Sequence, residues 1–262
     1  MSDTFFLLVR KFVVSFFQVF HHYCQMTSEQ KIATAKDEVH RELEDMIKTA
    51  ISDPVYELEA RLGTVIDNKF VSGVDRQHMD LLIRSMNILS ENSPDTLYAQ
   101  NKTWQEEENY YYSSGNKLLR TRVTFENDDI QSCTIQKIPV KSIILKTHVM
   151  DVRISLSKEH IVQRPPSIVS TSHVRLKQCR TFHIQNSPYR IDCSMIWCDV
   201  NKVTAEQNQT TLEPRFEIEC EFIPSLSKEW IKKHSLKKMS KSLLFKISDI
   251  MMSTGIHYKL HC

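Results

Sequence analysis

The chain has 262 residues, of which 41% are hydrophobic and 25% charged, and its net charge of +2 excludes a broad electrostatic attraction to nucleic acid. Its four glycines are scattered, which excludes the clustered-glycine loops that cradle phosphates in P-loop and dinucleotide-binding proteins. Its seven cysteines form no Cys-x-x-Cys pair, which argues against a structural zinc site and favours a reducing compartment over a disulfide framework.

The first 25 residues are apolar and aromatic, but Arg10-Lys11 interrupts them. Neither apolar run reaches the roughly 20 residues that a membrane-spanning helix needs, so we expect no strong membrane association. A helix lying on a membrane surface is one alternative. We favour the interpretation that residues 1–25 are a start-site artefact and that Met26 opens a single domain, residues 26–262.

The first elements of this domain are a helix and an acidic strand. Apolar residues recur with a helical period across residues 28–51. The strand that follows begins Glu57-Leu58-Glu59-Ala60. Because successive side chains of a strand point to opposite faces, Glu57 and Glu59 share one face and Leu58 and Ala60 the other. We interpret the apolar face as core.

A helix predicted over residues 75–89 leads into a long region of strands. Between residues 104 and 223, short alternating runs rich in β-branched and aromatic residues predict an antiparallel sheet or barrel. Each run has one apolar face and one polar or charged face. The polar faces carry Arg120, Arg122, Thr124 and Glu126, then Asp151, Arg153, Ser155, Ser157 and Glu159, then Arg175, Lys177 and Cys179, and then Arg190, Asp192 and Ser194.

Loops, a second acidic strand and a basic helix complete the chain. Arg164-Pro165-Pro166 and the polar stretch 201–211 predict loops. The second acidic strand carries Glu217, Glu219 and Glu221 on one face. A final helix is predicted from residue 227 to residue 251. Its lysines form either a surface for nucleic acid or an ordinary solvated face: Lys228, Lys232, Lys233, Lys237, Lys238 and Lys241.

Two arrangements of the strands satisfy this alternation. An open sandwich leaves the polar faces in water, whereas a closed barrel turns them into its lumen and covers its apolar outside with the three helices. We favour the barrel because it gives the helices a surface to cover. Its lumen would hold five carboxylates, a costly concentration unless cations neutralise it. These hard oxygen ligands suit Mg²⁺ or Mn²⁺.

Acids that face arginines and lysines across one lumen suit a particular class of substrate. Such a substrate carries several negative charges and arrives with a divalent metal, as a triphosphate does.

Two motifs then resemble a known family. Glu57-Leu58-Glu59-Ala60-Arg61-Leu62-Gly63 and Glu217-Ile218-Glu219-Cys220-Glu221 are similar, in this order, to the signature strands of the metal-dependent RNA 5′-triphosphatases of mRNA capping. This is the fungal, protozoan and viral type in the triphosphate tunnel metalloenzyme superfamily. The resemblance runs from about residue 56 to residue 222. It implies an α+β, mainly β fold: a closed tunnel of eight antiparallel strands with flanking helices.

The resemblance also implies roles for single residues. Glu57, Glu59, Glu217 and Glu219 would hold the metal, with Glu221 completing the third acidic position of its strand. Glu159, which ends a strand that closely resembles a family strand, would position the attacking water, and Asp192 would hold the basic groups in place. The expected phosphate-binding set is Arg120, Arg122, Lys137, Arg175, Lys177 and Arg190, of which Arg120, Lys177 and Arg190 would act in catalysis.

One position departs from the family pattern. The family has a second basic residue two places after the one matched by Lys177, and this chain has Cys179 there. Arg175 and Arg180 are the two candidates to substitute for it, and Arg175 faces the same way as Lys177. Arg180 would face away unless a β-bulge intervenes.

The function implied is hydrolysis of the γ-phosphate of triphosphate-ended RNA by in-line attack of water, assisted by Mg²⁺ or Mn²⁺. A separate guanylyltransferase chain, a monomeric or homodimeric state, and a nuclear location (cytoplasmic for a viral source) are the expectations that accompany it. Two alternatives stay open. One is a tripolyphosphatase or nucleoside triphosphatase of the same fold, and the other is a non-catalytic polyphosphate-binding scaffold, which Cys179 alone encourages.

Overall fold

The computed structural model describes residues 29–92, 97–99, 103–114, 117–126, 129–147, 149–162 and 171–255. The predicted tail, the domain boundary at residue 26 and the predicted loop at residues 164–166 lie outside these ranges. The chain divides at residue 40, and the unit His40–His261 contains the whole sheet.

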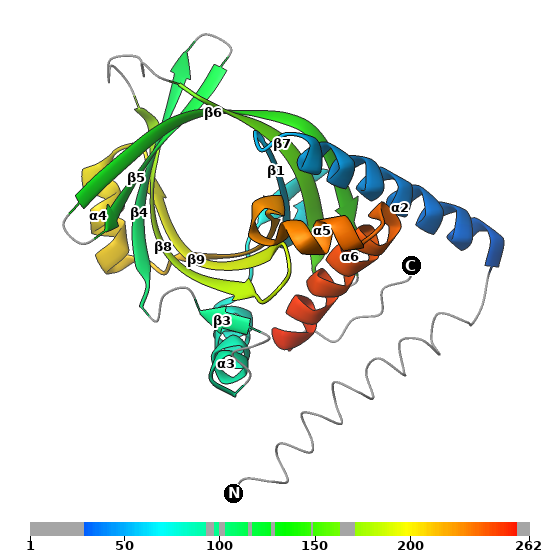
Figure 1. Cartoon of the computed structure of the whole chain (residues 1–262). Helices are drawn as coiled ribbons and strands as arrows, with labels where there is room; N and C mark the ends of the chain where they lie inside the picture. Colours follow the sequence, from blue (N-terminus) through cyan, green and yellow to red (C-terminus); the bar gives the residue numbers. More distant parts are fainter. Residues whose placement is uncertain are drawn as a thin grey trace, which may run out of the picture. The chain divides into compact units, whose positions relative to one another are not determined.

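Eight antiparallel strands close into a barrel, as predicted (Figure 1). They are β1 (Tyr56–Ile66), β4 (Gln105–Ser114), β5 (Lys117–Glu126), β6 (Asp129–Leu145), β7 (Asp151–Ile161), β8 (Thr171–Ile184), β9 (Tyr189–Asp199) and β10 (Arg215–Phe222). Around the barrel the order is β1-β10-β9-β8-β4-β5-β6-β7, and β7 returns to β1. The pairing of β1 with β10 closes the barrel and sets Arg61 opposite Glu219. Closure excludes the open sandwich.

Two short strands lie off the closed circle. β3 (Leu97–Ala99) pairs with β8. β2 (Lys69–Ser72) pairs with β1 through a two-residue turn at Asp67-Asn68, whose positive φ angles of 48° and 61° suit a tight hairpin. A β-carbon built on Gly63 would lie 2.7 Å from the Phe70 ring. The guanidinium of Arg153 lies over the Phe70 ring, 4.8 Å from its centroid.

The helices of the unit His40–His261 cover the apolar outside of the barrel, and α2 belongs to this unit from His40 onward. They are α2 (Glu29–Ser52), α3 (Arg76–Asn92), α4 (Lys202–Thr211), the 3₁₀ turn η1 (Pro224–Ser227), α5 (Lys228–Lys233) and α6 (Leu236–Ser253). Helices predicted over 28–51 and 75–89 are confirmed. The outward residues of both acidic strands are buried, as predicted: Leu58, Ala60, Ile218, Cys220 and Phe222. None of the helices in the described ranges is both long and apolar enough to cross a membrane.

The single helix predicted over residues 227–251 is wrong in one respect. Two helices, α5 and α6, occupy this range, with a break at His234 and Ser235. The Ser235 hydroxyl accepts a hydrogen bond from the backbone N–H of Lys238, which caps a new helix. The apolar period continues across the break, so periodicity alone predicts one helix.

The loop predicted at residues 201–211 is also wrong, because these residues form α4. The Asn201 side chain caps the helix by accepting from the Thr204 N–H at 2.9 Å. Ala205 is the only residue of α4 that is fully buried, and it packs against Val174 and Leu176. One small buried residue produces no apolar period, which is why the pattern predicts a loop.

Candidate active site

Six of the eight strands, β1, β4, β5, β8, β9 and β10, line a cavity of about 330 Å³ inside the barrel. Most of the predicted site residues line it: Glu57, Glu59, Glu219, Glu221, Arg120, Arg122, Arg175, Lys177, Arg190 and Asp192. Lys137 and Glu159 lie beside it, bonded to Glu57 and Arg120. The structure thus brings these predicted residues into one lumen, and Glu217 is the one that it sets apart.

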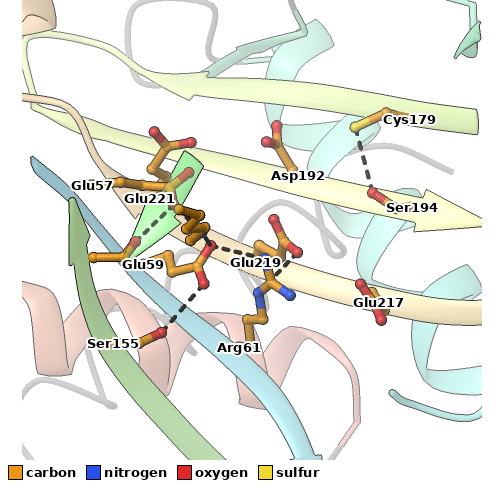
Figure 2. A network of polar contacts seen from close by, with 12 residues as sticks. Glu57, Glu59, Arg61, Ser155, Cys179, Asp192, Ser194, Glu217, Glu219 and Glu221 are labelled. Carbon is orange, nitrogen blue, oxygen red and sulfur yellow. Dashed lines mark hydrogen bonds and ion pairs between the residues drawn. The ribbon is translucent and has the colours of Figure 1, made fainter. Parts of the chain in front are cut away.

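Arg61 joins the two acidic strands (Figure 2). Its guanidinium lies 2.9 Å from Glu59 Oε2 on the same strand and 3.0 Å from Glu219 Oε1 on β10. Burial lowers the pKa of Arg61, but the surrounding carboxylates outweigh burial and raise it. Arg61 therefore stays charged and offsets part of the negative charge of this wall. The Ser155 hydroxyl donates to the other oxygen of Glu59, at 3.2 Å.

Lys137 links a second group of carboxylates. Its ammonium bonds to Glu57 and lies 3.5 Å from Glu59 and 3.9 Å from Glu159. Burial raises the pKa of Glu57, and the ion pair with Lys137 outweighs burial, so that the net direction is downward. The pKa of Glu159 is raised by burial and by the charge of Glu57, although Arg120 lies 3.2 Å away. A raised pKa is what a general base near neutral pH requires.

Arg190, at the start of β9, forms ion pairs with two acids, one on β9 and one on β10. It bonds to Glu221 and lies 3.0 Å from Asp192, which also accepts a hydrogen bond from the Thr181 hydroxyl at 2.8 Å. Burial raises the pKa of Glu221 to about 8, because Arg190 only partly offsets it and Glu57 adds like charge. Burial thus makes an ionised Glu221 costly in this corner of the lumen, and the charge of Glu57 adds to that cost.

Lys177 differs from the other basic residues of the lumen. It lines the cavity, yet it forms none of the ion pairs found among the described residues. Burial lowers the pKa of Lys177, and the neighbouring Cys179, Glu107 and Glu219 raise it, with a net upward direction. The lumen thus contains a protonated amine that no carboxylate neutralises by contact.

Cys179 occupies the departing position and faces the lumen beside Lys177. Its sulfur accepts from the Ser194 hydroxyl at 3.5 Å. Of the two candidate substitutes, Arg175 lines the cavity and Arg180 does not. Arg180 lies over the Phe182 ring at 5.6 Å, on the outer face of the strand.

Glu217 is fully buried and lies away from Glu57 and Glu221 along β10 (Figure 2). It accepts a hydrogen bond from Arg175 at 3.0 Å and forms an ion pair with Arg215 at 2.7 Å. These two arginines neutralise it, and it does not line the cavity. Glu217 therefore acts in the structure as an anchor for Arg175.

Two residues of the lumen, Arg61 and Glu107, have no role predicted from the sequence. Arg61 lies inside the first motif, for which the sequence predicts a role only for the glutamates. Glu107 pairs with Arg122 at 3.4 Å and accepts from Asn109 at 2.6 Å. Alternation along β4 places Gln105, Glu107, Asn109 and Tyr111 on one face, so the sequence pattern also predicts that Glu107 faces the lumen.

Among known proteins, the chain matches solved structures. No family model and no curated protein matches the chain. The RNA triphosphatase Pct1 of S. pombe aligns with a TM-score of 0.63 at 18% identity, over 81% of this chain and 92% of that one. The Mimivirus capping enzyme triphosphatase aligns with a TM-score of 0.55 at 12% identity, over 81% and 96%. The chain has the fold of these RNA triphosphatases.

A second structure of S. pombe Pct1, in complex with the Spt5 CTD, gives a TM-score of 0.62 at 17% identity, over 83% of this chain and 94% of that one. The triphosphate tunnel fold that the motifs implied is thereby confirmed. The likeness covers almost the whole length of each of these structures.

The donor set of this tunnel fits a hard divalent cation. Glu57, Glu59, Glu219 and Glu221 supply carboxylate oxygens from two adjacent strands, and such oxygens are the ligands that Mg²⁺ and Mn²⁺ prefer. Among the described residues, no three acidic, His or Cys side chains are already gathered as a metal site. Arg61 and Lys137 bond to these carboxylates instead.

Proposed function

We propose that the protein is a metal-dependent RNA 5′-triphosphatase that removes the γ-phosphate of triphosphate-ended RNA and leaves a diphosphate end. The observation that carries the proposal is the ammonium of Lys177, which lines the same closed lumen as the acidic strands and forms none of the ion pairs found among the described residues. An anionic chain fits beside the lysine, and a cation fits beside the carboxylates. The fold shared with two RNA triphosphatases supports RNA as the substrate.

We propose Mg²⁺ or Mn²⁺ as the cofactor, held by Glu57, Glu59, Glu219 and Glu221. When bound, the cation would withdraw charge from a γ-phosphate oxygen as charge redistributes in the transition state. The raised pKa of Glu221 supports this assignment, because burial makes its ionised form costly and a bound cation would offset that cost. Glu217 is left out of the set because two arginines neutralise it.

The residues of this chain would divide the remaining work. Lys177, Arg120 and Arg190 would neutralise phosphate oxygens, and Asp192 would hold Arg190 in place from 3.0 Å. Glu159 would orient the attacking water and accept its proton, since it lies at the lumen edge with a raised pKa. Water attacks in line with the leaving diphosphate oxygen, so no phosphoenzyme forms.

The test compares phosphate release from triphosphate-ended RNA, ATP and tripolyphosphate, with Mg²⁺, with Mn²⁺ and with a chelator. We expect metal-dependent turnover of the RNA that Glu219→Ala abolishes and that Glu91→Ala, an exposed glutamate on α3, leaves unchanged. Preference for tripolyphosphate would keep the tunnel chemistry and remove the role in capping. No release from any substrate would leave a polyphosphate-binding scaffold.

A role in capping would bring further expectations, which stay predictions. A separate guanylyltransferase chain would act on the diphosphate product, and the protein would be nuclear, or cytoplasmic if viral. Co-purification of the tagged full-length protein from its own cells would identify such a partner.

A further inference from the structure

A concentrated basic surface lies on α5 and the first half of α6. Six lysines are exposed within fourteen residues, and we call them the lysine face: Lys228, Lys232, Lys233, Lys237, Lys238 and Lys241. Glu229 is the only acid in this stretch, so its net charge is +5. The whole chain carries +2, which leaves −3 for everything else. The positive charge is therefore local.

The lysine face is almost free of compensating carboxylates. Within the described part of the chain, only Lys232 has an ion-pair partner, Glu229 at 3.9 Å, and both side chains are well exposed. Exposed pairs of this kind contribute little. The other five ammonium groups are available to an external anion.

Three contacts fix these helices against one end of the barrel. The backbone N–H of Ile223 donates to the Pro188 carbonyl at 2.6 Å, just before η1, the 3₁₀ turn that leads into α5. The Trp230 ring on α5 packs edge-on against Tyr189, with 5.9 Å between centroids. The Tyr189 hydroxyl donates to the Met239 carbonyl on α6 at 3.2 Å. Figure 1 shows α5 and α6 beside the part of the barrel that contains β1.

The cavity reaches the same end of the barrel. Tyr189 is followed at once by Arg190, which lines the cavity near the start of β9. Gln105, the first residue of β4, and Phe125, the second-last residue of β5, also line it. Because the strands are antiparallel, these positions and the end of β10 share one end of the barrel.

The opposite end is filled near β1. Phe70 lies over Gly63, and Arg153 stacks on the Phe70 ring. None of these three residues lines the cavity. Phe70 therefore narrows this end beside β1, while Tyr111 and Arg175 still line the cavity toward it. We infer that this narrowing favours exit at the end where α5 and α6 are fixed.

We propose that the lysine face binds the phosphate backbone of the RNA body as it leaves the tunnel, a proposal that rests on the function proposed above. An RNA held by its 5′ triphosphate carries one negative charge per nucleotide past this end of the barrel. Lysines act as point charges that bind such a backbone without reading its sequence. The continuity of the face with the cavity end favours RNA over an acidic protein partner.

The test replaces Lys228, Lys232, Lys233 and Lys237 together by Gln in the full chain. We expect KM for a long triphosphate-ended RNA to rise about tenfold or more with kcat unchanged, because only backbone contacts are lost. KM for tripolyphosphate and for a triphosphate-ended dinucleotide should stay within about twofold. The dependence of RNA affinity on salt should weaken by about 0.7 in logarithmic slope for each lysine that contacts a phosphate.

The matched control is the double variant Lys69→Gln with Lys146→Gln, which removes positive charge at the other end of the barrel. Circular dichroism and thermal melting check that both variants fold. Equal effects on long RNA and tripolyphosphate, or a larger effect in the control, would overturn the proposal. An unchanged RNA affinity together with lost binding of an acidic protein would assign the face to that partner instead.

Failure of the proposed function has a different signature. If the wild-type chain hydrolyses none of the substrates, fluorescence anisotropy with labelled triphosphate-ended RNA still measures binding. Weaker binding in the quadruple variant would then support the lysine face without the enzyme. Equal binding by wild type and variant would overturn the lysine face by itself.

Discussion

The Nε atom of Arg61 lies 3.0 Å from Oε1 of Glu219, across the strand pair that closes the barrel. The same guanidinium bonds to Glu59 at 2.9 Å. One positive charge thus stands between carboxylates of both acidic strands. Because a hard cation would bind these same oxygens, Arg61 stabilises the acidic wall when no cation is present.

Replacing Arg61 by Ala should destabilise the metal-free protein by about 3–5 kcal/mol, because buried carboxylates lose their partner. Mg²⁺ should then raise the melting temperature of the variant more than that of the wild type. Differential scanning calorimetry with and without Mg²⁺ measures both effects. Arg76→Ala, which breaks an exposed pair with Asp80, is the control and should change little. An equal response to Mg²⁺ in all three proteins would contradict the prediction.

Glu221→Gln should make stability less sensitive to pH in metal-free protein. The pKa of Glu221 is about 8 in the folded protein and near the ordinary 4.5 when unfolded. Between these values the unfolded state is ionised and the folded state is protonated, so wild-type stability falls as pH rises from about 5 to 8. The variant should therefore gain up to a few kcal/mol over wild type across this window. Urea unfolding at several pH values checks it, and a pH-independent difference would refute it.

Glu159→Gln separates catalysis from positioning. If Glu159 accepts the proton of the attacking water, kcat should fall by about 10²–10⁴ with little change in KM. The rise of kcat with pH that follows ionisation of Glu159 should also disappear. A higher KM with an intact pH profile would mean that Glu159 chiefly holds Arg120, 3.2 Å away. Glu206→Gln, on the exposed side of α4, is the control.

Gly63→Ala should destabilise the protein by about 1–3 kcal/mol. A β-carbon at this position would lie 2.2 Å from the Val71 carbonyl oxygen, so the hairpin of β1 and β2 must shift. Thermal melting measures the loss, and Thr64→Ala at the exposed neighbouring position is the control. Equal melting temperatures for Gly63→Ala and the control would show that the hairpin does not lie this close.

The described cysteines should differ in their reaction with a thiol reagent at pH 8. Cys133 and Cys198 are exposed and should be alkylated first. Burial raises the pKa of the Cys220 thiol to about 12 and also raises that of Cys193, so the reactive thiolate is scarce at both. Peptide mass spectrometry after timed alkylation gives the order. Early labelling of Cys220 in folded protein would contradict the burial described here.

The alternation of side chains determined much of the fold and site from the sequence. A strand of period two assigns each residue to a face whatever its neighbours are, and so Glu57, Glu59, Lys177 and Arg190 were placed in the lumen correctly. The resemblance of two motifs then predicted the closed tunnel. Where a local pattern was weak, as in α4 with its single buried Ala205, the sequence predicted a loop.

Only the tertiary structure decided which lumen residues meet. Partners across the barrel depend on the order and register of strands, which long-range hydrogen bonds set and no local pattern encodes. That register places Arg61 between the two acidic strands and gives Glu217 to Arg175 rather than to the other carboxylates. It also leaves Lys177 in the lumen without an ion-pair partner among the described residues, because every nearby carboxylate lies closer to another cation.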